Sequence, residues 1–254
     1  VHIALQYGAI DSARKMLDKT TFPTNMPNSY LRTVLHEAAL TGDVDLFKFI
    51  LSKGGNPRAL DYQRNTILHH AAISKNYFLV DFILTSGFVD PKALNMHKFS
   101  ALHYAAANGP IESTKALIIA APEMLNNAIS GYAPIHMAVK HQHIDIAHLI
   151  MTHVNFDPTP VTPSYMTPIH IAARIPNTEL LKMLITSQLF DLDIPDAIGW
   201  SPIHYAASKG SLECMKVLIV NGANLTLKTN DNEDVMDILR RRGSRNIFQY
   251  ILLG

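Results

Sequence analysis

Residues 167–172 read Thr-Pro-Ile-His-Ile-Ala, and residues 201–206 read Ser-Pro-Ile-His-Tyr-Ala. Looser versions of this stretch occur at 66–69, which read Thr-Ile-Leu-His, and at 100–103, which read Ser-Ala-Leu-His. The histidine recurs every 33 or 34 residues along nearly the whole chain, at His2, His36, His69, His103, His136, His170 and His204. A fixed period of this length is the signature of repeat architectures, so the sequence predicts a chain of stacked repeats.

Further columns keep the same period as the histidines. The residue before each histidine is apolar, for example Leu35, Leu68 and Ile169, and alanine stands two positions after every one of them. Glycine stands six positions after the column in five repeats, at Gly8, Gly42, Gly109, Gly210 and Gly243. Several columns in one register exclude coincidence.

Each repeat is predicted to contain two short helices. The first covers segments such as 35–41, and the glycine that follows suits the left-handed conformation that ends a helix. The second has a broad apolar face, as in Leu-Phe-Lys-Phe-Ile-Leu at 46–51. Helices this short are not stable alone, so each needs its neighbours, as in a solenoid.

The stretches quoted above resemble the Thr-Pro-Leu-His-x-Ala signature of the ankyrin repeat family. The resemblance covers nearly the whole chain and implies an all-α solenoid of about eight helix–turn–helix repeats with β-hairpin-like finger loops. It also implies that the ring of the recurrent histidine hydrogen-bonds the backbone and the nearby Thr or Ser, which is a structural role. We expect a single domain over 1–254, with repeats at 1–27, 28–60, 61–94, 95–127, 128–161, 162–195, 196–228 and 229–254.

The departures from the pattern lie in particular repeats. Gln142 and Pro176 replace the helix-ending glycine, so we expect different turns there. The eighth repeat has Asp237 in place of the histidine. The sequence begins at Val1, within the tetrapeptide of the first repeat, and we expect it to be a fragment of a longer chain with further protein covering one or both ends.

Composition and charge exclude several classes of protein. The sequence is 48% hydrophobic and 17% charged, which argues against intrinsic disorder. The net charge of +1 favours neither nucleic-acid binding nor a polybasic membrane patch. No stretch of about 18 apolar residues and no signal peptide is visible, so no membrane insertion is expected. A single cysteine, Cys214, fits a reducing interior, and we expect an intracellular, cytoplasmic protein, with cytoskeletal association as a variant of that expectation.

The sequence gives little support for a catalytic or metal site. His141, His143, His148 and His153 form the one further cluster of histidines, but no acidic or cysteine ligand completes a zinc site at a recognisable spacing. Cys214 occupies an apolar position of a second helix and is interpreted as a buried side chain. No nucleotide-binding, hydrolase or kinase motif is present, so we expect neither an enzyme nor a cofactor or metal site.

The resemblance implies that a partner contacts the finger tips and the concave face of the first helices. Large apolar or aromatic side chains are expected at the tips, at Tyr30, Tyr62, Phe99, Tyr132, Met166 and Trp200. Lys140, Arg174 and Lys209 give the first helices of the later repeats a basic face. These nine residues are the predicted partner site, and the partner is predicted to be a protein with acidic and apolar anchor residues.

Three kinds of function fit these observations. The first is an intracellular scaffold or adaptor that binds another protein. The second is a permanent structural subunit of a cytoskeletal or other large assembly. The third is the ankyrin region of a larger enzyme or membrane channel.

Overall fold

The computed structural model describes residues 1–19 and 23–253, and every regular element in these residues is helical. The all-α prediction is confirmed. The chain divides into two compact units, Val1–Ser130 and Gly131–Gly254, which we call the N-terminal and C-terminal units. In the part of the chain that is described, no helix combines the length and apolar character needed to cross a membrane.

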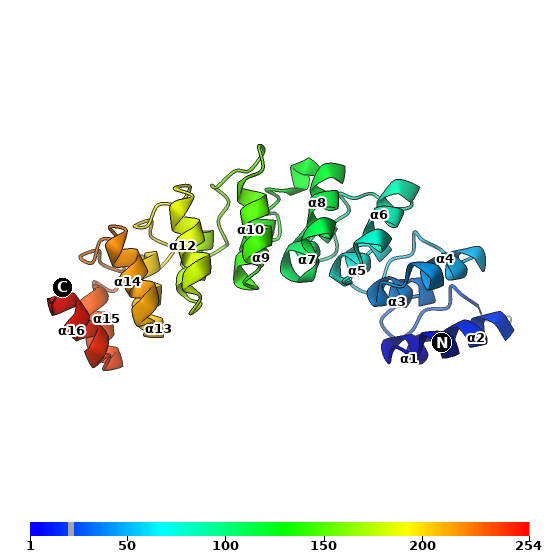
Figure 1. Cartoon of the computed structure of the whole chain (residues 1–254), viewed down its shortest axis with the longest axis horizontal. Coiled ribbons are helices and arrows are strands. Elements are labelled where there is room, and N and C mark those ends of the chain that lie inside the picture. The colour runs from blue at the N-terminus through cyan, green and yellow to red at the C-terminus, as the bar shows by residue number, and fades with distance from the viewer. Residues whose placement is uncertain (20–22, 254) are drawn as a thin grey trace. The chain divides into compact units, whose positions relative to one another are not determined.

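The N-terminal unit, blue to green in Figure 1, holds four helix pairs. Each first helix contacts the first helix of the next pair, and α2 and α6 contact the second helices α4 and α8. The pairs are α1 (His2–Gln6) and α2 (Ile10–Lys19), α3 (Val34–Thr41) and α4 (Val44–Ser52), α5 (Ile67–Ile73) and α6 (Tyr77–Ser86), and α7 (Ala101–Asn108) and α8 (Ile111–Ala120), followed by the 3-10 helix η1 (Pro122–Met124).

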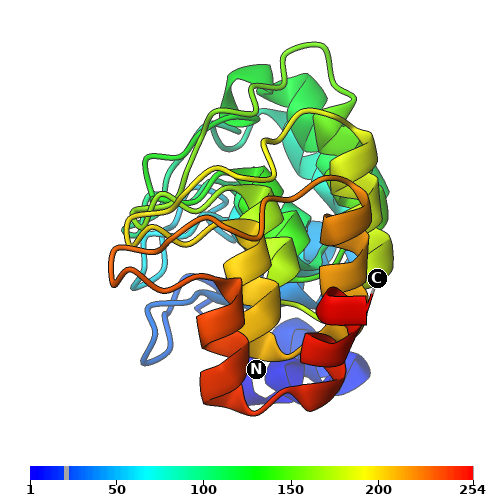
Figure 2. The same ribbon diagram turned by 90° about the vertical axis from the view of Figure 1, so that its left-hand side faces the viewer.

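The C-terminal unit repeats the arrangement. Its first helices contact one another in chain order, and α10, α12 and α14 form the row of second helices. Figure 2 shows the connecting loops of this unit extending to one side, past its first helices. The pairs are α9 (Pro134–Lys140) and α10 (Ile144–Met151), α11 (Pro168–Ala173) and α12 (Thr178–Thr186), α13 (Pro202–Lys209) and α14 (Leu212–Val220), and α15 (Val235–Arg242) and α16 (Arg245–Leu253).

Short polar residues begin the second helices. The side chains of Asp43, Asn177 and Ser211 each accept a hydrogen bond from the backbone N–H three residues later. Such N-caps satisfy donors that have no partner within the helix, and they fix where each helix starts. The local sequence therefore sets the helix boundary, and packing then stabilises the short helix.

The first helices do not all end in the same way. Gly42, Gly210 and Gly243 adopt the left-handed conformation, as predicted. Gly109 is instead extended, with φ −83° and ψ 169°. Pro110 follows this glycine, and a residue before proline is forced into extended conformations. The expected difference at Gln142 is also absent, since Gln142 takes the left-handed conformation of the glycine with φ 63°.

The apolar columns form the core of each unit. In the N-terminal unit, Leu46, Phe47 and Ile50 of α4 and their counterparts on α6 are completely buried. Helix α8 departs from this pattern, because the completely buried Ser113 and Thr114 occupy the two positions that are Leu46 and Phe47 in α4. Neither hydroxyl has a hydrogen-bond partner among the described atoms. This helix therefore buries two polar groups without compensation.

The finger loops pair through isolated backbone hydrogen bonds. In the N-terminal unit, the N–H of Tyr62 donates to the carbonyl of Tyr30 at 2.9 Å, and in the C-terminal unit the N–H of Ala197 donates to the carbonyl of Ser164 at 3.0 Å. These contacts are too few to make a β-strand in residues 1–19 and 23–253. The fingers are thus a row of tight turns linked side by side within each unit.

Candidate functional site

The recurrent histidine lies at the start of the first helix in seven repeats, and it is buried in all of them except the first, where His2 is half-buried. The backbone N–H of Thr66 donates to His69 Nδ1 at 3.1 Å, and the Thr66 hydroxyl lies 2.9 Å from the same atom. The same pair of contacts recurs in four other repeats, at His36, His103, His170 and His204. His136 keeps only the backbone contact, at 3.0 Å, because Ala133 replaces the hydroxyl residue.

The opposite ring nitrogen reaches the following loop. His69 Nε2 lies 3.1 Å from the carbonyl of Phe99, and in the first repeat His2 Nε2 lies 3.0 Å from the carbonyl of Met26. Because a backbone N–H can only donate, Nδ1 of His69 carries no proton, and the neutral ring donates through Nε2. The geometry thus fixes one tautomer of His69 and joins the start of its helix to the next loop.

Burial keeps these rings neutral. It lowers the pKa of His36 and of His69 to about 4. Burial likewise lowers the pKa of His170 and His204 below the ordinary value. Protonation would place a charge in a dry environment and remove the acceptor at Nδ1, so the column is unsuited to acid–base chemistry near neutral pH.

A second recurrent position, which the sequence analysis did not identify, organises the fingers. Asp61 Oδ1 accepts hydrogen bonds from the backbone N–H groups of Gln63 and Asn65, at 2.9 and 2.8 Å. Asn28, Asn95 and Asp196 make the same pair of contacts in their own fingers. In the sequence this position can be recognised as an Asn or Asp that stands five residues before the Thr or Ser that caps the helix.

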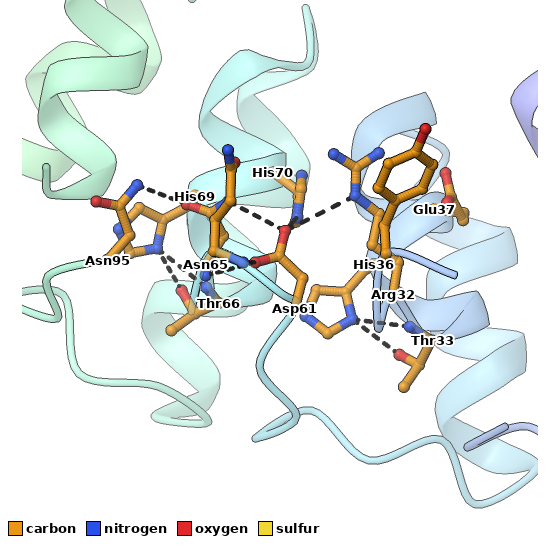
Figure 3. Close-up of polar contacts among 12 residues, drawn as sticks. Arg32, Thr33, His36, Glu37, Asp61, Asn65, Thr66, His69, His70 and Asn95 are labelled. Carbon is orange, nitrogen blue, oxygen red and sulfur yellow. Dashed lines mark hydrogen bonds and ion pairs between the residues drawn. The ribbon is translucent and has the colours of Figure 1, made fainter. Parts of the chain in front are cut away.

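The other side-chain oxygen of Asp61 belongs to a buried polar network, drawn in Figure 3. Asp61 Oδ2 lies 2.9 Å from His70 Nε2 and accepts a hydrogen bond from Asn65 Nδ2 at 3.0 Å. Arg32 Nε lies 3.7 Å from the same oxygen. Burial raises the pKa of Asp61, but the hydrogen bonds from His70 and Asn65 outweigh it and hold the pKa well below its ordinary value.

This network is structural, because it links Asp61 in the finger of the third repeat to His70 on α5 and to Arg32 of the second repeat. The Asp–His pair is almost completely buried, and among the described residues no hydroxyl or thiol nucleophile hydrogen-bonds to His70. The described residues also contain no group of three His, Cys, Asp or Glu side chains placed to hold a metal ion. We therefore assign the network to the packing of the second and third repeats.

The predicted tip residues lie in different environments. Tyr30 and Tyr62 are exposed on their turns. Met166 was expected at an exposed tip, and this is wrong, because only 7% of it is exposed. Its carbonyl accepts a hydrogen bond from the N–H of Thr162 and closes the turn, and Tyr165 occupies the exposed position with φ 59°. Met166 instead faces a pocket.

Phe99, Tyr132 and Trp200 lie at the bases of their fingers. Each is half-buried and stands over the histidine of its own repeat, with ring centroids 5.2, 6.3 and 6.3 Å apart. Trp200 also packs against Tyr205 at 5.0 Å. The turns themselves expose other apolar side chains that were not included in the predicted site, namely Met96, Ile129, Tyr165 and Ile198.

Five of the nine predicted partner residues line one pocket of about 370 Å³ in the C-terminal unit. We call it the basic pocket. It is lined by Tyr132, Lys140, Thr162, Met166, Ile171, Arg174, Ile175 and Lys209. Lys140 and Lys209 are the last residues of α9 and α13, and Arg174 directly follows α11. Three successive first helices therefore each present one cation to the pocket.

The basic pocket combines a polar rim with an apolar floor. Lys140, Arg174 and Lys209 are exposed, whereas Met166 and Ile171 are buried. No acidic residue lines the pocket, and no ion pair joins its three cations to a described acidic side chain.

Aromatic rings and a sulfur atom position two of the cations. Lys140 Nζ lies 5.7 Å from the centroid of the Tyr132 ring. The guanidinium carbon of Arg174 lies 5.4 Å from the centroid of the Tyr205 ring, and Arg174 Nη1 contacts Met166 Sδ at 3.8 Å. Contacts of cations with ring faces hold the charged groups without neutralising them.

The N-terminal unit has a different surface at the corresponding place. Its pocket of about 710 Å³ is lined by Tyr30, Arg32, Glu37 and neighbouring residues, so its charges are mixed. The first helices α3, α5 and α7 end in Thr41, Ile73 and Asn108, none of which is basic. Cations are favoured at the C-terminal end of any helix by its dipole, so the dipole alone does not explain why only the C-terminal unit carries them here.

Comparison with known proteins identifies the repeat. A family model described as ankyrin repeats (3 copies) matches residues 1–95, 35–127, 80–162 and 135–229. These matches together cover well over half of the chain. Comparison with curated proteins finds no match.

Two solved structures have the same fold. The human ASB11 ankyrin repeat domain is 24% identical to this chain, with a TM-score of 0.72, and the match covers 82% of this chain and 91% of that one. The ankyrin repeat domain of Bcl-3, described as a unique member of the IkappaB protein family, is 23% identical, with a TM-score of 0.67, and the match covers 86% and 98%. At these identities the likeness establishes the fold alone.

Proposed function

This chain belongs to the ankyrin repeat family, and from that premise we propose that it is a scaffold or adaptor that binds another protein through the basic pocket and the adjoining finger tips. Ankyrin repeats are generally protein–protein interaction modules, and domains of this kind are typically non-catalytic. The partner that fits the site presents acidic side chains next to an apolar anchor.

The observation that carries the proposal is the convergence of three unpaired cations over an apolar floor. Like charges on one pocket destabilise the free protein, so a fold has no structural reason to gather them. A partner with acidic groups removes that repulsion and gains complementary electrostatics. The exposed Tyr165 and Ile198 on the neighbouring turns add apolar area of the kind that dominates interface energetics.

Site-specific photo-crosslinking tests the proposal in cell extract. A photo-reactive amino acid is placed at Tyr165 or Ile198, next to the basic pocket, and at Ile119 or Val220, which are apolar and even more exposed but lie on second helices. We expect the same discrete protein to be crosslinked from the two finger positions and not from the two helix positions. Crosslinking from the helix positions alone would show that a different surface binds.

Charge substitution provides the quantitative test. Lys140→Gln combined with Arg174→Gln is expected to weaken binding of the crosslinked protein at least tenfold. Lys182→Gln combined with Lys48→Gln removes the same charge from exposed positions on second helices and serves as the matched control. Equal affinities for the two double variants would refute the proposed site.

A further inference from the structure

We propose that the basic pocket recognises a phosphotyrosine side chain of the partner protein. This inference rests on the proposed function and specifies its ligand. The phosphate lies among Lys140, Arg174 and Lys209, and the aryl ring lies against Met166, Ile171 and Ile175. Three features of the pocket carry the inference, namely its charge, its floor and its volume.

The charge of the rim matches a phosphate. The three cations have no acidic counterpart in the lining of the pocket. A carboxylate supplies one negative charge, whereas a phosphorylated side chain carries between about 1.5 and 2 negative charges at neutral pH and has three acceptor oxygens. Three donors from three helices match that number of acceptors, and the Arg174 guanidinium offers the planar pair of N–H groups that binds phosphate.

The floor distinguishes a phosphotyrosine from the shorter phosphorylated residues. Met166 and Ile171 are buried beneath the exposed cations, and Arg174 Nη1 contacts Met166 Sδ at 3.8 Å. A phosphotyrosine presents an apolar ring that can lie on this floor and a phosphate that can reach the cations of the rim. Methionine sulfur also makes favourable contacts with aromatic rings. Phosphoserine has no group to cover the floor, so the part of the floor that faces the pocket would stay uncovered.

The volume and the overall charge argue against larger ligands. At about 370 Å³ the pocket is at the small end of the range for ligand sites, and it suits one side chain. The chain has a net charge of +1, which does not provide the extended basic surface that nucleic acids require. A peptide with one phosphorylated tyrosine meets both conditions.

Small-molecule ligands test separately how the aryl ring and the phosphate contribute to binding. The protein is labelled with ¹³C in its methionine methyl groups, and Met166→Leu assigns the Met166 signal. We expect phenyl phosphate to shift this signal with a Kd at least fivefold lower than that of inorganic phosphate or of phenylacetate. Arg174→Gln should weaken phenyl phosphate binding at least fivefold, and Lys182→Gln should leave it unchanged. A Met166 signal that responds equally to phenyl phosphate and phenylacetate would overturn the inference.

Matched peptides then test the inference on protein sequences. An array presents tyrosine, phosphotyrosine, phosphoserine and glutamate at one central position within the same set of flanking sequences. We expect retention of phosphotyrosine peptides only, and loss of that retention with Arg174→Gln. Equal retention of glutamate or phosphoserine peptides, still lost with Arg174→Gln, would overturn the phosphotyrosine inference and leave the proposed function standing.

Two further outcomes separate the inference from the proposed function. If the crosslinked partner binds through the pocket and treatment with a tyrosine phosphatase leaves its affinity unchanged, the inference fails and the function stands. If neither probes nor partner respond to the pocket substitutions, both fail. Tighter binding of homopolymeric RNA than of any peptide, lost with Arg174→Gln, would assign the pocket to nucleic acid and overturn both.

Discussion

In the repeats of His69, His103, His170 and His204, the histidine at the start of the first helix joins three parts of the chain. In the case of His69, Nδ1 accepts hydrogen bonds from the backbone N–H and the hydroxyl of Thr66. The opposite ring nitrogen, Nε2, donates a hydrogen bond to the carbonyl of Phe99 in the following loop. One side chain therefore fixes a helix start and attaches the next finger. Because the ring is buried, water cannot replace these contacts when the ring is removed.

Substitution of His69 by alanine is expected to destabilise the chain by about 3 kcal/mol, because the Thr66 N–H would be left buried without a partner and the Phe99 carbonyl would keep only its hydrogen bond from the Asn95 N–H. The free energy of unfolding from urea titration measures the effect. His97→Ala, on the exposed turn of the next finger, is the control and should change it by less than about 0.5 kcal/mol. Similar values for the two variants would show that the hydrogen bonds contribute little.

Ser113 and Thr114 of α8 are the clearest unfavourable positions in the core of the N-terminal unit. Both are completely buried, and their hydroxyl groups have no partner among the described atoms. Thr114→Val keeps the shape and removes the hydroxyl, so it should stabilise the protein by about 1 kcal/mol. Thr85→Val is the matched control, since Thr85 is exposed and its hydroxyl donates to the Asp81 carbonyl. A loss of stability with Thr114→Val, measured by thermal and urea unfolding, would contradict the prediction.

At the scale of elements, the fingers depend on left-handed residues at their turns. Leu31, Arg64, Lys98, Tyr165 and Asn232 have positive φ where Gly131 and Gly199 stand in other repeats. At Gly199 an added Cβ would lie 2.7 Å from the backbone nitrogen of Asn230 in the next finger. At Gly222, also left-handed, an added Cβ would meet nothing within 4 Å.

Alanine substitutions at these two glycines distinguish the cost of backbone strain from the cost of a steric clash with the next finger. Both Gly199→Ala and Gly222→Ala force alanine into the left-handed region, which costs about 1 kcal/mol. Only Gly199→Ala must also move the next finger, so it should cost at least about 1 kcal/mol more. Urea unfolding of the two variants gives the difference directly. Equal losses of stability would mean that the fingers approach each other less closely than the structure indicates.

The helices and the exposed tips differ in how far sequence predicts them. Helices follow from columns that recur in register, because capping and burial depend on residue type. Exposure on a finger depends on which residue of the turn is left-handed, and side chains as different as Leu31 and Tyr165 take that place. Met166 was therefore assigned to an exposed tip, although it turns inward. The Asn or Asp that begins the finger recurs five residues before the capping Thr or Ser, so this position could have been predicted from the sequence.

At the scale of the whole molecule, periodicity explains why distant residues meet in the basic pocket. Lys140 and Arg174 each stand four positions after their histidine, and Lys209 stands five positions after His204. Stacked repeats bring equivalent positions together, so the basic face could be predicted from sequence. The pocket's depth and apolar floor could not, because they depend on how Met166, Ile171 and Ile175 pack.

The buried histidines of both units make the stability of the molecule depend on pH. The pKa of His36 and of His69 is lowered from 6.5 to about 4, so the unfolded chain binds more protons than the folded chain between these values. Stability is then fully present above pH 6.5 and is lost as the pH falls towards 4. From pH 7 to pH 5 we expect a loss of about 2 kcal/mol for each of these two histidines. His170 and His204 add to the loss in the same direction.

Urea unfolding at pH values between 7 and 5 tests this dependence before ordinary carboxylates begin to titrate. The histidine ring signals, followed by NMR in the folded protein over the same range, provide the control. The buried rings should keep the chemical shifts of the neutral Nε2–H tautomer throughout this range. A free energy of unfolding that stays constant down to pH 5 would show that the buried rings accept protons without loss of their contacts, against the geometry at Nδ1.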